Sequence, residues 1–166
     1  AGLALGEVIV LRAYARYLRQ IGISYSQSYI EDALAQNPPI VRKYNELFRA
    51  LHTPGQGAGA GTRAKGLVVE IEHLLDAVAN LDQDRILRRY LNLIQATLRT
   101  NYFQRPDGKR KRYVSFKIDS RAVDDMPLPR PLVEIWVYSA DVEAVHLRGG
   151  RVARGGIRWS DRPEDF

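Results

Sequence analysis

The residues best suited to chemistry gather near the C-terminal end of the chain, between Leu147 and Arg162, where five arginines alternate with glycine pairs at 149–150 and 155–156. Adjacent glycines let a ligand approach the main chain without meeting a Cβ atom. Guanidinium groups present planar donors that match carboxylates or phosphates. The glycine pairs also disfavour a helix here, so we expect strand and turn. Residue types alone leave two readings open: an anion site with backbone donors, or a glycine-hinged β-turn with solvated arginines.

Other reactive patterns are weak. The chain has no cysteine, which excludes disulfides, thiolate metal sites and a cysteine nucleophile. His73 falls among polar residues and is expected on the surface, whereas His52 falls at a helix end, where its charge would favour the C-terminal dipole. The glycine-rich stretch 53–61 has no preceding strand and no GxxxxGK[ST] pattern, so we interpret it as a flexible loop. We therefore predict no catalytic residue and no metal site in this chain.

The net charge of +6 raises the question of nucleic acid. A basic run at 109–112 follows a turn signal at 106–108 and is the densest cluster of positive charge. Such a run can contact phosphates, but it also suits a solvated turn flank or a sheet edge, where lysine and arginine discourage pairing between sheets. The overall charge alone equally suits a solvated surface or one that meets an acidic neighbour in a larger assembly. Because no nucleic-acid-binding motif accompanies it, we expect no nucleic-acid partner.

No segment predicts a membrane span or a targeting peptide. The apolar run that starts at Val8 stops at Arg12, whereas about 20 apolar residues are needed to cross a bilayer. No charged start followed by an apolar stretch and a cleavage site is visible. We expect a soluble, cytoplasmic protein.

Helical periodicity dominates the first hundred residues and predicts a small bundle that positions the rest. Gly22 is expected to end the first helix as a left-handed cap. The second helix begins at Ser24 or Ser26, two registers that the sequence leaves open. Asn37 should cap the third helix and Asp82 the fifth. The apolar stripes cover residues 8–21, 30–34, 40–51, 67–78 and 86–98.

Strand periodicity replaces helical periodicity beyond about residue 104. Alternating residues predict strands at 113–118 and 133–138, a further strand at 142–147, and a last stretch at 152–159 broken by glycines. The prolines within 126–131 predict an extended connector. The fold class is therefore α+β, with a helical segment at 1–104 and a β-rich segment at 105–166. Because the chain stops abruptly at Phe166, after a charged stretch, we interpret the β-rich segment as truncated.

Segment 152–162, Val-Ala-Arg-Gly-Gly-Ile-Arg-Trp-Ser-Asp-Arg, closely resembles the start of the catalytic region in large-type bacterial NAD-specific glutamate dehydrogenases. Segments 11–20, 28–34, 84–90, 99–104, 115–123 and 145–150 resemble the same family in order, so the resemblance covers nearly the whole chain. It implies that the β-rich segment begins the substrate-binding domain of a glutamate-dehydrogenase-like fold. It also implies oxidative deamination of L-glutamate to 2-oxoglutarate and ammonia, with NAD as the hydride acceptor.

The resemblance also implies roles for individual residues. In smaller glutamate dehydrogenases a Lys-Gly-Gly segment helps to bind the side-chain carboxylate of the substrate. Carried over, that role falls to Arg154, with Gly155 and Gly156 giving access to the backbone. Arginine in place of lysine keeps the charge but changes its reach and geometry. Arg158 is a second candidate, which alternatively holds Asp161 or a neighbouring loop.

The resemblance places the catalytic lysine and the dinucleotide fold downstream of the matched segments. This sequence contains no glycine-rich lysine segment and no GxGxxG after a strand. We therefore expect an inactive fragment that does not bind NAD by itself, from a parent that uses NAD and forms a homo-oligomer. The alternative is that the helical half is a non-catalytic regulatory or assembly module, and less favoured is a basic nucleic-acid-binding domain.

Overall fold

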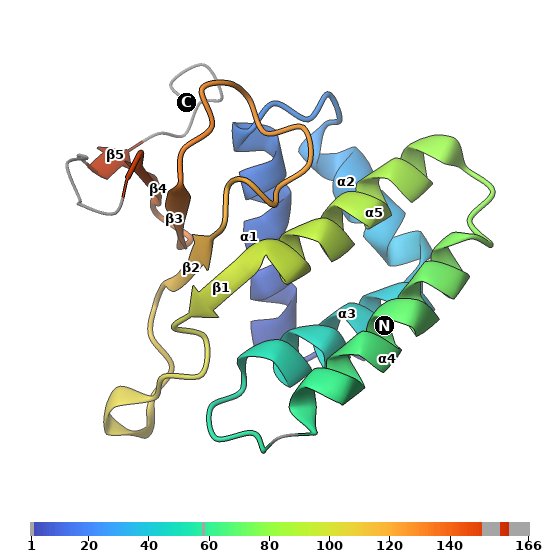
Figure 1. Ribbon diagram of the computed structural model, residues 1–166, viewed down its shortest axis with the longest axis horizontal. Coiled ribbons are helices and arrows are strands. Elements are labelled where there is room, and N and C mark those ends of the chain that lie inside the picture. Colours follow the sequence, from blue (N-terminus) through green and yellow to red (C-terminus); the bar gives the residue numbers. More distant parts are fainter. Residues whose placement is uncertain (1, 58, 151–156, 160–166) are drawn as a thin grey trace.

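The computed structural model describes residues 2–57, 59–150 and, for the backbone alone, 157–159 (Figure 1). Five helices come first, as the apolar periodicity predicts. They are α1 (Leu5–Gln20), α2 (Gln27–Gln36), α3 (Pro38–His52), α4 (Ala60–Leu75) and α5 (Leu81–Ala96).

Five strands follow and form one antiparallel sheet in the sequential order β1-β2-β3-β4-β5. The strands are β1 (Thr97–Thr100), β2 (Val114–Ile118), β3 (Val133–Tyr138), β4 (Glu143–Arg148) and β5 (Ile157–Trp159), and a short 3-10 turn (Pro106–Gly108) precedes β2. Helices that precede an antiparallel sheet confirm the predicted α+β class. The division of the chain at residue 104 stays a prediction.

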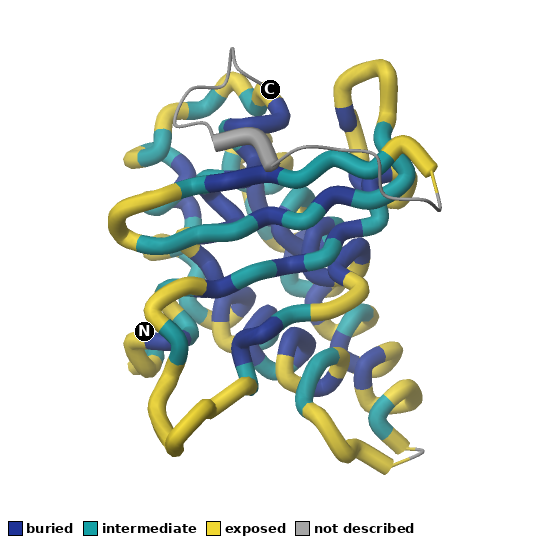
Figure 2. Tube along the Cα trace, turned by 90° about the vertical axis from the view of Figure 1, so that its left-hand side faces the viewer, coloured by how far each residue is buried: buried dark blue, intermediate teal, exposed yellow. Residues whose placement is uncertain are grey.

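Helix α1 lies against one face of the sheet, and this junction forms the centre of the core (Figure 1). The indole Nε1 of Trp136, on β3, donates to the carbonyl of Ala13 at 2.9 Å. The ring of Tyr14 packs on Phe116 of β2 with centroids 4.8 Å apart. No described helix covers the opposite face, where the strands are largely of intermediate burial (Figure 2).

The helix caps confirm some expectations and correct others. Gly22 has φ +94°, as a left-handed cap requires. The side chain of Ser26 accepts from the amide of Tyr29, which decides the register of α2 in favour of Ser26. Asn37 stands at the cap position of α3, but its side chain makes no capping hydrogen bond and instead donates to the carbonyl of Ala33.

Three expectations about helix ends were wrong. Helix α5 is capped by Asn80, whose side chain accepts from the amides of Asp82 and Gln83, and not by Asp82. Helix α4 begins at Ala60, inside the stretch that we expected to be loop. The last part of the fifth apolar stripe is not helical, because residues from Thr97 onward form β1 and pair with β2.

The two helical histidines differ in their surroundings. His73 is exposed, as expected. His52 packs on the ring of Phe48 with centroids 4.9 Å apart, and its burial lowers its pKa to about 4. At neutral pH it is therefore uncharged, so the expected favourable charge at the end of α3 is not present.

In the part of the chain that the structure covers, the helices are too short or too polar to cross a bilayer.

Candidate functional site

The four predicted substrate-binding residues lie in and beside the connection between β4 and β5. Arg154, Gly155 and Gly156 are outside the described residues. Arg158 lies on β5, where its backbone is opposite Val145 of β4. The structure thus places the start and the end of this connection, and the grouping of the four residues in one site stays a prediction.

The connection leaves the sheet at the end where β3 begins and β4 stops. Val133 pairs there with Arg148, after which the chain continues into Gly149 and Gly150. Both glycines are exposed, and a Cβ atom added at either would meet no described atom within 4 Å. Packing among the described residues therefore does not require glycine at these positions.

A buried carboxyl group lies at the same end of the sheet, one residue along β3. Glu134 is fully buried and pairs in register with Leu147 of β4. The hydroxyl of Tyr17, on α1, donates to its Oε2 atom. Its Oε1 atom is closed to solvent and has no hydrogen-bond partner.

Burial determines the charge state of Glu134. Desolvation raises its pKa to about 7, and the hydrogen bond from Tyr17 offsets only part of that effect. A substantial share of the protein therefore carries the neutral acid at physiological pH.

A cavity of about 370 Å³ separates the end of α1 from the proline-rich connector. The connector has no helix or strand between Met126 and Pro131, as its prolines predict. Apolar groups form most of the cavity wall, and Glu134 is one of the residues that line it. The wall includes Gln20, Ile21, Met126, Leu128, Glu134 and Leu147.

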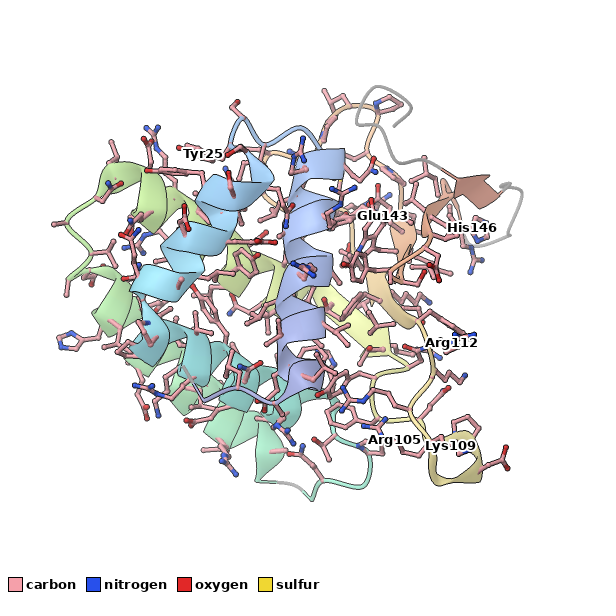
Figure 3. The ribbon with its side chains drawn as sticks, turned by 180° about the vertical axis from the view of Figure 1, so that it is seen from behind. Tyr25, Arg105, Lys109, Arg112, Glu143 and His146 are labelled. Atoms are coloured by element: carbon pink, nitrogen blue, oxygen red, sulfur yellow. The ribbon has the colours of Figure 1, made fainter. Side chains whose placement is uncertain are left out.

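The far end of the same face carries an ion pair. Arg16 of α1 forms an ion pair with Glu143 of β4, and the side-chain amide of Gln20 lies 3.4 Å from that carboxylate (Figure 3). Alternation along the strands showed that Glu134 and Trp136 share a face, but not that this face is the buried one. The sequence analysis missed Glu134, Tyr17 and Glu143, because only the packing of α1 on the sheet brings them together.

Neither a metal cluster nor a parallel dinucleotide-binding fold occurs among the described residues. No group of three or more His, Asp or Glu side chains among them is arranged to hold a metal. All four described strand pairings are antiparallel, whereas a dinucleotide-binding fold is built on parallel strands with crossover helices. The described strands therefore do not form that fold.

Two family models match the chain. Residues 70–166 match the model described as "Bacterial NAD-glutamate dehydrogenase, catalytic domain". Residues 1–54 match the model described as "Glutamate dehydrogenase, helical motif 3". The first match covers the end of the helical segment and the whole sheet.

Curated relatives give the same result over the full chain. The chain is 50% identical to the NAD-specific glutamate dehydrogenase of Mycobacterium tuberculosis and 50% identical to that of Halomonas elongata, with all of the chain covered in both cases. Identity to the Pseudomonas aeruginosa protein of the same name is 48%, again over the whole chain. In each comparison the chain spans about 10% of the length of the relative.

Proposed function

The chain belongs to the bacterial NAD-glutamate dehydrogenase family, and from this we propose that it is part of an enzyme that oxidises L-glutamate to 2-oxoglutarate and ammonia with NAD as the hydride acceptor. The observation that carries the proposal is 50% identity over the entire chain to two enzymes named NAD-specific glutamate dehydrogenase. The segment that most resembles the catalytic region, residues 152–162, lies inside the catalytic-domain match.

Within that enzyme, the β4–β5 connection forms one wall of the substrate site. Arg154 binds the side-chain carboxylate of glutamate through its guanidinium group, whose two parallel N–H donors fit a carboxylate. Gly155 and Gly156 allow the substrate to approach the main chain. Arg158 either adds a second donor or holds the connection in place. The exposed glycines at 149 and 150 support this role, because nothing described covers the chain where the connection starts.

The residues of this chain bind and orient the substrate but do not carry out the amine chemistry. When bound, NAD supplies the hydride acceptor. Deprotonation of the substrate amine needs a lysine of lowered pKa and a carboxylate that moves protons, and no sequence motif assigns either role to a residue here. We therefore propose that the isolated chain is inactive and does not bind NAD. Calorimetric titration of the chain with NAD would contradict this by showing saturable, stoichiometric binding.

Steady-state kinetics of the intact dehydrogenase test the role of Arg154. The Arg154→Ala variant is expected to raise the KM for glutamate by about tenfold or more, because a charged substrate group loses its hydrogen-bonded partner. The KM for NAD should stay unchanged. Arg121→Ala is the matched control, because Arg121 is exposed and forms no described ion pair. An unchanged glutamate KM in Arg154→Ala would remove this residue from the substrate site.

We further propose that the parent enzyme is a cytoplasmic homo-oligomer and that the helical segment takes part in its assembly. Large apolar side chains are exposed on three helices, with Leu5 78%, Val69 65% and Leu81 63% exposed. Exposed apolar groups of this size favour a protein contact. Replacing the three residues by serine should lower the assembly state measured by analytical ultracentrifugation, and an unchanged sedimentation coefficient would argue against assembly through these helices.

A further inference from the structure

The positive charge of this protein is concentrated in one short segment, the basic segment, residues 99–117. It contains seven lysines and arginines against a single acid, Asp107, and therefore carries a net charge of +6. The rest of the chain has 18 basic and 18 acidic residues, so the whole net charge of the protein resides in the basic segment. The basic residues are Arg99, Arg105, Lys109, Arg110, Lys111, Arg112 and Lys117.

The basic segment forms β1, the connection that follows it, and β2. In Figure 3 the labelled side chains of Arg105, Lys109 and Arg112 lie around this connection, at the side of the molecule away from α4 and α5. Strand β1 is an edge strand of the sheet, since only β2 pairs with it. The charges are thus presented together at one edge of the molecule.

No ion pair neutralises these seven side chains within the described residues. The ion pairs that the structure contains belong to cations of the helices, including Arg16, Lys43 and Arg88. Arg110 acts on one described carboxyl, that of Glu7. Burial raises the pKa of Glu7, but the hydrogen bonds from Ala4 and Arg49 and the charges of Arg49 and Arg110 together lower it. Five of the seven residues are exposed, and Lys111 and Lys117 are of intermediate burial.

The fold holds like charges close together instead of separating them. Arg99 and Lys117 are direct cross-strand partners on the same face of the sheet, an arrangement that destabilises a strand pair. The guanidinium groups of Arg105 and Arg110 both lie on the ring of Tyr102, at 5.8 and 4.9 Å from its centroid. Lys111 is held by a 2.6 Å hydrogen bond to Gln104. These contacts fix the side chains and leave their charge uncompensated.

We propose that the basic segment docks on an acidic protein surface supplied by the remainder of the dehydrogenase polypeptide. A partner rich in carboxylates would relieve the repulsion that the isolated chain carries. The chain spans about a tenth of its relatives, so most of the parent polypeptide lies outside it and is available as the partner.

Apolar groups among the cations favour a protein surface over nucleic acid. Leu98 is 49% exposed and Tyr113 is 45% exposed beside the charged side chains. Arginine and tyrosine are both enriched at protein interfaces relative to the rest of a protein surface. The docking does not depend on the substrate role of Arg154, because the basic segment lies outside the β4–β5 connection.

Zero-length carbodiimide cross-linking of the intact dehydrogenase, read by mass spectrometry, tests the proposal. The reagent joins a lysine to a carboxylate only when the two are in contact. Lys109 and Lys111 should link to an Asp or Glu outside residues 1–166, and these links should fall in 1 M salt, where screening extends over only about 3 Å. Lys43 should link to Glu46 and Glu70 inside the chain and is the positive control. Exposed Lys65, without a described ion pair, is the negative control.

Charge reversal gives a second readout. Lys109→Glu, Arg110→Glu and Arg112→Glu combined should lower the yield of Lys111 cross-links outside residues 1–166 by about tenfold or more. The matched control combines Arg42→Glu, Arg63→Glu and Lys65→Glu, which changes the same charge on exposed helix positions and should leave these links unchanged. The proposal fails if Lys109 and Lys111 in the unaltered enzyme link externally no more than Lys65 does. It also fails if the reversed variant loses salt-dependent binding to a random DNA duplex while its Lys111 cross-links are unchanged.

Discussion

The junction between α1 and the sheet and the basic segment at 99–117 use polar residues in opposite ways. At the junction, Tyr17, Trp136 and Arg16 each have a partner across the contact, so their polarity fixes helix and sheet in one arrangement. In the basic segment the charges have no described acidic partner and like charges are neighbours. Partnered polar groups hold helix and sheet together at the junction, whereas the cations of the basic segment make no such contact among the described residues.

Removing Trp136 should have the largest effect on stability. Its side chain is fully buried and its indole N–H is bonded to Ala13, so Trp136→Ala should lower the free energy of unfolding by about 3–5 kcal/mol. Ile135→Ala, on the open face of the sheet, is the matched change and should cost about 1 kcal/mol. Urea denaturation measures both. Equal losses would mean that the open face is as closely packed as the junction.

The carboxyl of Glu134 should make stability depend on pH. Because its pKa is about 7 in the folded protein and about 4.5 ordinarily, the folded state binds more protons between these values. The free energy of unfolding is therefore highest, as far as Glu134 is concerned, below pH 4.5, where the carboxyl is neutral in both states. This stability is lost as the pH rises through 7, by about 3 kcal/mol in total.

Denaturation curves between pH 4.5 and 8.5 measure this dependence. The Glu134→Gln variant should be less sensitive to pH and more stable than the wild type at pH 8, while its amide oxygen still accepts from Tyr17. Exposed Glu72→Gln is the control and should follow the wild-type curve. An unaltered pH dependence in Glu134→Gln would show that this carboxyl ionises normally.

A single buried hydroxyl gives a smaller effect. The Tyr14 hydroxyl lies 2.8 Å from Thr97 Oγ1, which itself donates to the carbonyl of Leu93, so Tyr14→Phe should cost about 1–2 kcal/mol. Tyr113→Phe removes a hydroxyl from an exposed ring of the basic segment and should change stability negligibly. Thermal unfolding of the two variants compares the regions directly, and the comparison fails if Tyr113→Phe costs as much as Tyr14→Phe.

The smallest expected effects distinguish paired from unpaired arginines. Arg88 contacts Asp84 and Asp76, and Arg88→Ala should cost less than about 1 kcal/mol, because these ion pairs lie on the surface. Arg112→Ala should leave the stability of the isolated chain unchanged or raise it slightly at low salt. A clear loss of stability in Arg112→Ala would show that this charge has a partner within the chain.

Local sequence signals predicted most of this fold. Apolar periodicity located five helices and three of the strands. As expected, Gly22 has a positive φ after α1, and the proline-rich connector contains no helix or strand. These features depend on residues close in sequence. Strand β1 was missed because Thr97–Thr100 becomes a strand only by pairing with β2, and the apolar pattern continues smoothly into it from α5.

The candidate site was less predictable. The glycine and arginine pattern identified the connection between β4 and β5, but the burial of Glu134 depends on α1, which lies more than a hundred residues away in sequence. Alternation in β3 separates its two faces but does not reveal which face a helix will cover. Val133, Ile135 and Val137 form the more apolar face, and yet this face is less buried than the one that carries Glu134 and Trp136. The ion-pair states of the cations likewise depend on tertiary packing.

The central claim is that Arg154 recognises the side-chain carboxylate of the substrate. The most direct test compares glutamate with norvaline, which lacks that carboxylate, as substrates of the intact enzyme and of Arg154→Ala. We expect the substitution to lower kcat/KM for glutamate by about ten- to a hundredfold and to leave kcat/KM for norvaline nearly unchanged. The enzyme would then largely lose its preference for glutamate over norvaline. An equal loss for both substrates, or no loss for either, would contradict the claim.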